Sequence, residues 1–401
     1  MGNKEERLLS QQFYAFLCDV VGNEKMVRSR RIFFKIYDYL SYVPAVRVLS
    51  SGSLAEGVFL PGSDFDVMAV IEPCPVYDSQ EHIPKHHKTS GLLVDTSQTP
   101  PGFANIKVYG NDISILIFGY HSFIIEKEMM LSNCIKIHFS NIHKLFWNLS
   151  NLGINSEILA QLHGPCVSDF FGTYDVLCCL RCMSWPKIAA SWFDRPRSSW
   201  PPANVISEIY QEDVLLAPIG SKFGAIEDNP AEWRISFSVA EKMLVHSFNH
   251  TQLLCYAMLK LVLREIVNKK SKTKNLLCSY FMKTVLFWVI EESDNSQWMP
   301  QHLLYCFRSC LKRLIYIVQI GYCPNYFIPE NNMFEGKIFG RCQDDLLLEL
   351  QNIYVQGFNF VLQSETLSKF FIQQPGTVYD IMNYQKGDEE KAVFPLIQFV
   401  N

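Results

Sequence analysis

The chain has 401 residues, of which 48% are hydrophobic and 13% aromatic, and its formal net charge is −4. This composition excludes an intrinsically disordered chain and is sufficient for one large or two medium folded domains. The nearly balanced charge excludes a uniformly basic protein, so any contact with nucleic acid depends on local clusters of Lys and Arg.

The N-terminal sequence and the cysteines indicate an intracellular protein. The segment MGNKEERLLS is charged and lacks the apolar centre of a signal peptide. Glu6 departs from the Ser or Thr that N-myristoylation requires. The apolar stretches are far shorter than the roughly 20 residues that span a bilayer. We therefore predict a cytoplasmic protein, with the nucleus as the open alternative, no membrane partner and thirteen reduced cysteines.

Residues 8–42 carry apolar side chains at helical spacing, which predicts one long helix with a bend near Gly22. The middle of this helix contains a basic run, Arg28, Arg30, Arg31 and Lys35. Such a run forms either a solvated helix face or a surface for an anionic ligand, and the residue pattern leaves both open.

Short apolar or alternating runs separated by Gly, Pro and Asp follow between about residues 45 and 245. They predict a domain built on a β-sheet. After Glu241 the pattern changes to long helical periods with few strand signals. A mostly helical second domain is therefore predicted to follow the sheet.

Asp64 and Asp66 stand one residue apart at the start of an apolar run. Residues two apart in a strand share a face, so both carboxylates are expected on the same side. Two like charges are costly to bury and require a compensating cation, and two carboxylates suit Mg²⁺. Asp-x-Asp alone also occurs on surface strands, but the upstream Gly52-Ser53 permits a tight turn that can hold a phosphate.

A two-metal site requires a third carboxylate, and Asp175 is the candidate. It is an isolated Asp in the apolar, strand-like run YDVLCCL (174–180). Taken alone, such an Asp is equally well explained by a buried ion pair with Arg. Gly-Ser, Asp-x-Asp and a later strand Asp together favour nucleotidyl transfer, in which two metal ions stabilise the attacking and leaving oxygens.

The segment GSLAEGVFLPGSDFDVM (52–68) resembles the signature of the cyclic GMP–AMP synthase and Mab-twenty-one nucleotidyltransferase superfamily. Further stretches agree in the same order: YDVLCCLRCMSWP (174–186), EWRISFSVAEKMLV (232–245), LCYAMLKLVLRE (254–265), LLCSYFMKTVLFW (276–288), SDNSQWMP (293–300) and NYFIPENNMF (325–334). The resemblance covers residues 45–340 and includes the cGAS-like receptors of invertebrate animals.

The resemblance implies an α+β, two-lobed fold. A nucleotidyltransferase core, with a mixed twisted sheet and a long N-terminal spine helix, is expected over residues 1–245. A helical lobe, the Mab-type C-terminal domain, is expected over residues 246–401. Nucleotides would bind in the cleft between the two lobes.

The resemblance also implies roles for individual residues. Gly52 and Ser53 would contact the donor phosphates, and Asp175 would favour deprotonation of the attacking ribose hydroxyl. The three carboxylates, Asp64, Asp66 and Asp175, would hold two Mg²⁺ or Mn²⁺ ions. Nucleotide contacts are implied for Arg234, Ser236, Ser238, Lys260, Ser279 and Tyr280. Alternatives remain for Lys260 as a surface lysine and for Tyr280 as a core residue.

The sequence departs from vertebrate DNA-sensing relatives, which carry a zinc ribbon. The corresponding segment, VHSFNHTQLLCYA (245–257), lacks the clustered cysteines, so no structural zinc is expected, although His246 and His250 have a spacing that can bind zinc. The cysteines of residues 178–182 are instead predicted to be buried thiols. Relatives without the ribbon include sensors of double-stranded RNA, which is therefore favoured over DNA as the activator.

The candidate RNA contacts are the basic residues of the spine helix and the loop NKKSKTKN (268–275), whose alternative is a solvated charged surface. The implied function is the synthesis of a cyclic dinucleotide second messenger from ATP, GTP or other nucleoside triphosphates. The implied biological role is innate immune sensing, and the activating ligand could also induce a dimer. Two alternatives remain open: a non-catalytic Mab-type interaction or developmental protein, and a polymerase of linear oligonucleotides.

Overall fold

The computed structural model describes residues 4–43, 45–84, 90–110, 117–118, 121–122, 125–126, 129–130, 161–163, 166–168, 173–221 and 231–373. The chain forms two compact units. The sheet unit comprises Val21–Leu253 and Cys323–Gly336, and the helical unit comprises Met1–Val20, Leu254–Tyr322 and Lys337–Asn401. The predicted α+β fold, with a mixed sheet, a long N-terminal helical segment and a helical C-terminal region, is confirmed.

The N-terminal segment is two helices rather than one, α1 (Lys4–Val21) and α2 (Glu24–Leu40). The break lies at the predicted bend, where Gly22 has a φ of 112° in the left-handed region. Asn23 caps α2, because its side chain accepts a hydrogen bond of 3.0 Å from the Met26 amide. A left-handed glycine followed by a capping Asn ends one helix and begins the next.

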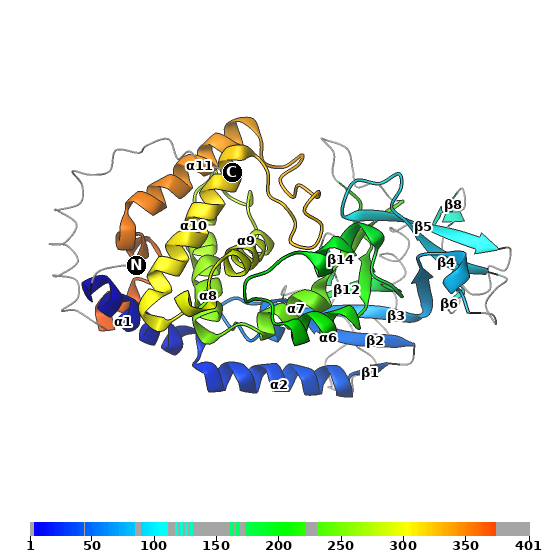
Figure 1. Ribbon diagram of the computed structural model, residues 1–401, viewed down its shortest axis with the longest axis horizontal. Coiled ribbons are helices and arrows are strands. Elements are labelled where there is room, and N and C mark those ends of the chain that lie inside the picture. Colours follow the sequence, from blue (N-terminus) through cyan, green and yellow to red (C-terminus); the bar gives the residue numbers. More distant parts are fainter. Residues whose placement is uncertain are drawn as a thin grey trace. The chain divides into compact units, whose positions relative to one another are not determined.

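The sheet unit is built on a mixed β-sheet (Figure 1), in which neighbouring strands follow the order β1–β2–β3–β4–β5–β14–β13–β12–β11–β10 and β3 also pairs with β12. Its strands are β1 (Tyr42–Val43), β2 (Val46–Ser51), β3 (Phe65–Tyr77), β4 (Ser90–Asp95), β5 (Phe103–Gly110), β10 (Gln161–His163), β11 (Cys166–Ser168), β12 (Tyr174–Cys182), β13 (Val214–Ala217) and β14 (Glu232–Ser236). Among the described residues between β5 and β10 there are four two-residue strands. β8 (Ile125–Glu126) and β9 (Met129–Met130) belong to the same sheet, and β6 (Ile117–Phe118) and β7 (His121–Ser122) pair with each other.

The register of β3 is the feature that positions the carboxylates. β12 pairs with β3 in parallel, so that Asp175 is opposite Asp66 and Tyr174 is opposite Phe65. On its other side β3 pairs antiparallel with β2, which places Ser51 opposite Asp66. Because successive side chains alternate between faces, Asp66 and Asp175 share one face, and Phe65 and Tyr174 share the other.

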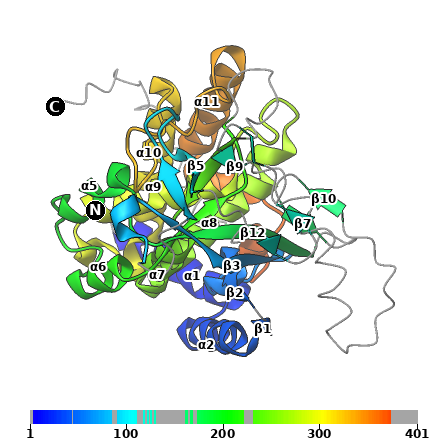
Figure 2. The same ribbon diagram turned by 90° about the vertical axis from the view of Figure 1, so that its right-hand side faces the viewer.

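Both faces of the β3–β12 pair are packed. On the carboxylate face, a buried apolar cluster continues along the strands: Val70, Leu177, Cys179, Leu215 and Ala217. On the opposite face, the Phe65 ring lies 5.1 Å from the ring of Tyr174 and 5.4 Å from the ring of Phe34 in α2. Figure 2 shows α2 beside β2. The inner face of α2 therefore holds the strands from behind the site.

Besides α2, the helices described in the sheet unit are α3 (Gly52–Ala55), α5 (Ser191–Asp194), α6 (Ala203–Tyr210) and α7 (Ser238–His246). α8 (His250–Glu265) leads the chain into the helical unit, which also contains α9 (Ser279–Glu292), α10 (Leu303–Ile320), α11 (Gly340–Val355) and α12 (Lys369–Gln373). Cys178, Cys179 and Cys182 are buried free thiols, as predicted. Within the described residues, no helix combines the length and apolar character that crossing a membrane requires.

Candidate active site

Asp64, Asp66 and Asp175 come together at one end of the β3–β12 pair. One carboxylate oxygen from each lies within 4.8 Å of the oxygens from the other two. Asp66 and Asp175 are direct neighbours across the parallel strands, and Asp64 immediately precedes β3. Three converging carboxylates form a hard oxygen donor set, which suits Mg²⁺ or Mn²⁺. Without a cation, the same arrangement places like charges side by side.

Gly52 packs directly against one of these carboxylates. Its φ is 67°, and a Cβ atom at this position would lie 1.7 Å from Asp66 Oδ2. The next residue, Ser53, is buried in the short helix α3. The Gly-Ser turn is therefore adjacent to the carboxylates, and only a glycine leaves room for Asp66.

Ser168 is a site residue that the sequence analysis missed. It is buried on β11, opposite Asp175 in the β11–β12 register. Its hydroxyl donates a hydrogen bond to Asp175 Oδ1. The bond orients the carboxylate toward the other two. No motif marks this serine, because only the strand pairing makes it a neighbour of Asp175.

The negative charge of the site acts on a nearby thiol. The pKa of Cys166 on β11 is raised to about 12, first by burial and then by the carboxylates of Asp175, Asp66 and Asp64, while Arg234 lowers it. The thiol therefore stays protonated at neutral pH and does not act as a nucleophile. Arg234 acts on this thiol together with the carboxylates, so it belongs to the same electrostatic environment.

The WRISFS segment contributes three predicted residues. Arg234 and Ser236 lie on β14, where Arg234 is exposed and the two share a face. Ser238 begins α7, and its Oγ atom is buried without a hydrogen-bond partner among the described residues. A buried hydroxyl of this kind fits a contact with a bound ligand.

Arg31 of α2 holds the chain behind the Gly-Ser turn. Its Nε donates to the carbonyl of Glu56 at 2.9 Å. Its two terminal nitrogens donate to the carbonyls of His246 at 3.1 Å and Val245 at 3.0 Å. Burial lowers the pKa of Arg31 to about 10, against the opposing effect of Glu56, so the guanidinium remains charged at neutral pH.

His246 and Arg30 complete this inner scaffold. Nε2 of His246 donates to the Ala55 carbonyl at 3.0 Å, and burial is the main cause that lowers the pKa of His246 to about 4. Arg30 donates to the carbonyls of Val21 and Gly57. Two of the four basic residues proposed as RNA contacts, Arg30 and Arg31, therefore bind backbone carbonyls. The other two, Arg28 and Lys35, are exposed.

Lys260, Ser279 and Tyr280 belong to the helical unit. Lys260 is half-buried on α8, with its Nζ 5.7 Å from the centre of the Tyr256 ring. Ser279 is the exposed first residue of α9, and Tyr280 is half-buried beside it. Their contact with a nucleotide stays a prediction. In the basic loop of this unit, Lys270 pairs with Glu349 at 2.6 Å and Lys272 with Asp345 at 3.3 Å.

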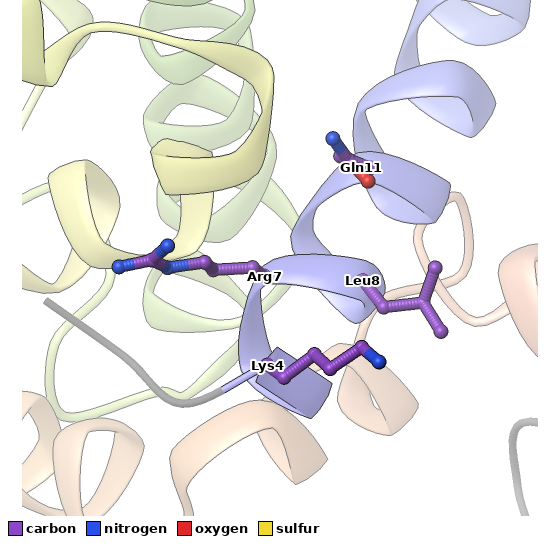
Figure 3. Close-up of a pocket in the computed structure, with 4 residues that line it drawn as sticks. All are labelled: Lys4, Arg7, Leu8 and Gln11. Carbon is purple, nitrogen blue, oxygen red and sulfur yellow. The ribbon is translucent and has the colours of Figure 1, made fainter.

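The helical unit also has a shallow hollow beside the first turns of α1 (Figure 3). Its lining residues, Lys4, Arg7, Leu8 and Gln11, all come from this helix. Arg7 points to the opposite side from Leu8. The lining contains no carboxylate and none of the predicted nucleotide-binding residues, so the hollow is not the metal site.

Comparison with known proteins gives two domain matches. The Mab-21 protein nucleotidyltransferase domain matches residues 173–247, and the Mab-21 protein HhH/H2TH-like domain matches residues 252–352. These two segments include β12 with Asp175, the WRISFS segment and helices α8 to α10.

Three curated relatives are similar over part of their length. Cyclic GMP-AMP synthase of Sus scrofa is 26% identical over 179 residues, which are 41% of this chain and 36% of that protein. Cyclic GMP-AMP synthase of Mus musculus is 28% identical over 177 residues, 41% of this chain and 34% of that protein. Protein mab-21-like of Drosophila melanogaster is 28% identical over 160 residues, 38% of this chain and 42% of that protein. The chain thus spans less than half the length of these relatives.

Proposed function

Because this chain belongs to the cyclic GMP–AMP synthase and Mab-21 nucleotidyltransferase superfamily, we propose that it is an active enzyme that joins two nucleoside triphosphates into a cyclic dinucleotide. The observation that carries the proposal is the convergence of Asp64, Asp66 and Asp175 within 4.8 Å. Like charges at this distance repel one another until a cation binds among them, so the cluster favours a metal-dependent enzyme over a non-catalytic protein.

The donor set supports two divalent cations as cofactors. Asp64, Asp66 and Asp175 would hold Mg²⁺ or Mn²⁺ through hard carboxylate oxygens. The space that Gly52 leaves for the Asp66 carboxylate keeps that oxygen in the cluster. When bound, the ions would neutralise phosphate charge at the attacking and leaving oxygens.

The residues of the chain would position the substrates and transfer a proton. The Gly52-Ser53 turn would hold the donor triphosphate, and Asp175, oriented by Ser168, would accept the proton of the acceptor ribose hydroxyl. The hydroxyl oxygen then attacks the α-phosphate of the donor, and pyrophosphate leaves. A second transfer on the linear product would close the ring. Further nucleotide contacts are proposed for Arg234, Ser236, Ser238, Lys260, Ser279 and Tyr280.

The activator that we propose is double-stranded RNA in the cytoplasm, with α2 as the receiving helix. Arg28 and Lys35 are exposed for contacts with phosphate. Arg31 supports a link from α2 to the site, because it binds the carbonyl of Glu56, three residues after Ser53. A ligand on α2 would thereby order the segment 52–63, which hydrogen exchange with and without RNA can measure. Dimerisation on ligand binding stays a prediction.

The test is an assay with labelled nucleoside triphosphates, Mg²⁺ or Mn²⁺, and a panel of double-stranded RNA and DNA. We expect pyrophosphate release and a labelled product that resists phosphatase, both lost in the double variant Asp64→Asn/Asp66→Asn. The variant should remain folded, with an unfolding temperature no lower than that of the metal-free wild type, which makes it the matched control.

The other outcomes identify the alternatives. A labelled product with phosphatase-sensitive ends would indicate a linear polymerase. Absence of product with every nucleic acid, together with equal metal-induced stabilisation of wild type and double variant, would favour the non-catalytic reading. The similarity to Protein mab-21-like fits that second candidate.

A further inference from the structure

The outward face of α2 carries a row of exposed apolar side chains, the α2 ridge, formed by Met26, Ile32, Phe33, Ile36, Tyr39 and Leu40. Their exposed fractions run from 49% for Met26 to 87% for Tyr39. Among the described residues, six of the nineteen exposed large apolar side chains lie on this one helix. Figures 1 and 2 show the helix at the edge of the sheet unit, with β2 on its inner side.

The ridge is large enough to be an interface. Its exposed surface is on the order of 700 Å², close to the roughly 800 Å² that each partner contributes to a standard protein–protein interface. A contiguous apolar patch of this size is more than a typical monomer exposes without function. The inner face of the same helix is already packed by Val27 and Phe34, so the ridge does not serve the fold of the sheet unit.

The spacing of the ridge indicates a helical occupant. Met26, Phe33 and Leu40 are seven residues apart, as are Ile32 and Tyr39. A seven-residue apolar repeat on an exposed helix is the pattern by which one helix packs along another. Double-stranded RNA is bound through phosphate and ribose contacts, which these side chains do not provide.

The charges along the ridge indicate the character of that helix. Successive residues of a helix are about 100° apart around its axis, which places Lys25 on the same face as the ridge. Arg28 and Lys35 lie next to Ile32 and Tyr39, along one border of the ridge. All three basic residues are exposed. Glu24 is the one exposed acidic residue of α2, a helix that the structure describes in full, since Asp38 pairs with Lys242.

A second copy of the chain does not complement this border. In an antiparallel pair of α2 helices, the same basic borders would meet. In a parallel pair, the basic border would meet the side that carries Arg30. Along this border each copy contributes one carboxylate, Glu24, against Arg28 and Lys35, and apposed like charges disfavour an interface. We propose that the α2 ridge docks an amphipathic helix of a partner protein whose apolar stripe is bordered by Asp or Glu.

The experiment measures binding of labelled 21-residue peptides to the purified full chain by fluorescence anisotropy. One peptide carries Leu at heptad positions a and d with Glu at e and g, and a second carries Lys in place of Glu. Like charges keep both peptides from self-association. We expect the Glu peptide to bind at least about tenfold more tightly than the Lys peptide, by charge complementarity.

Variants locate the binding. The ridge variant Phe33→Ser/Ile36→Ser should lose at least about tenfold in affinity for the Glu peptide. The matched control Phe339→Ser/Leu348→Ser removes two equally exposed apolar side chains from the helical unit and should bind normally. The charge variant Arg28→Glu/Lys35→Glu should reverse the preference between the two peptides.

Any of the following results would overturn the proposal. Equal binding of the two peptides, or binding of neither, would remove the acidic helix as occupant. A concentration-dependent dimer that the ridge variant abolishes would assign the ridge to a second copy. Loss of RNA binding in the ridge variant would assign it to nucleic acid, and loss of binding to phosphatidylserine vesicles would assign it to a membrane surface. None of these readouts requires nucleotide synthesis, so the test is independent of the proposed catalysis.

Discussion

The carboxylates at the end of β3–β12 and the carboxylate of Glu265 in the helical unit differ in what surrounds them. Glu265 is 6% exposed, and both of its oxygens accept hydrogen bonds. The donors are the Ser364 hydroxyl at 2.6 Å, the Thr366 amide at 2.9 Å, the Thr366 hydroxyl at 2.7 Å and Arg264 at 2.7 Å. At the end of β3–β12, each carboxylate instead has two further carboxylates within 4.8 Å.

The difference separates a carboxylate that stabilises the fold from the proposed metal ligands. Burial by itself would raise the pKa of Glu265, but the hydrogen bonds from Ser364, Arg264 and Thr366 lower it to about 2. The charged form of Glu265 therefore stabilises the fold. Converging carboxylates have the opposite effect on stability until a cation binds among them. Removing one charge from each site should thus change stability in opposite directions.

The largest expected effect comes from Asp175→Asn. We expect nucleotide transfer to fall by at least about 1,000-fold, because the proposed proton acceptor and metal ligand is lost. In EDTA the free energy of unfolding should rise by about 0.5 kcal/mol, because Asp66 then faces a neutral side chain across the strand pair. Urea unfolding with EDTA or Mn²⁺ measures both states, and the stabilisation by Mn²⁺ should disappear.

Glu265→Gln is the matched change at the other site. It should lower the free energy of unfolding by about 1.5–3 kcal/mol, the cost of weakening hydrogen bonds to a charged group. Activity per folded molecule should remain. If Asp175→Asn instead lowered stability in EDTA, the repulsion argued for the converging carboxylates would be wrong.

The next effect is at Gly52. Gly52→Ala introduces a Cβ atom 1.7 Å from Asp66 Oδ2, so the carboxylate must move. Displacement of a reacting group by about 1 Å costs roughly 100-fold in rate, and we expect that loss together with weaker Mn²⁺ stabilisation. Gly340→Ala in the helical unit is the control. Its φ of 57° is also left-handed, but nothing lies within 4 Å of its Cβ position.

Both glycine variants carry the backbone cost of a left-handed alanine, roughly 1 kcal/mol. Equal loss of activity in the two would therefore attribute the effect at Gly52 to stability alone. A loss confined to Gly52→Ala would attribute it to the position of Asp66.

A smaller effect is expected at Ser168. Ser168→Ala removes the hydrogen bond to Asp175 and should weaken Mn²⁺ binding by about tenfold, as for other residues that orient a ligand. Calorimetric titration of Mn²⁺ measures the affinity without a reaction. Ser168→Thr keeps the hydroxyl and should restore binding. Unchanged affinity in Ser168→Ala would show that the neighbouring carboxylates alone orient Asp175.

The features of this molecule that depend on local sequence pattern could be predicted from the sequence. Alternation along β3 predicted a common side for Asp64 and Asp66, and the α+β order of elements followed from changes in periodicity. The features that could not be predicted depend on which strands pair and which helix faces are packed. Ser168 becomes a partner of Asp175 only through the β11–β12 register. From the sequence alone Arg31 is one residue of a basic run on a helix, and only the packing of α2 shows that it binds the Glu56 carbonyl.

The last effect concerns pH and again separates the two regions. Burial lowers the folded-state pKa of His246 to about 4 from its ordinary value of 6.5, against the opposing effect of the bond to the Ala55 carbonyl, so the buried neutral form contributes stability to the sheet unit. That contribution is complete above pH 6.5 and is lost as pH falls from 6.5 to 4, by at most about 1.4 kcal/mol per unit. The contribution of Glu265 is lost in a separate window, between pH 4.5 and about 2.

His246→Gln tests the first window, because an amide N–H can donate to the Ala55 carbonyl without titrating. Urea unfolding between pH 7 and pH 4.5 should show a steeper loss of stability for the wild type than for the variant. At pH 7 the two should differ by less than about 1 kcal/mol, since the hydrogen bond is retained. Parallel curves for the two proteins would place the acid sensitivity outside the contact that supports the Gly52-Ser53 turn, and the turn would then stay ordered under conditions that protonate His246.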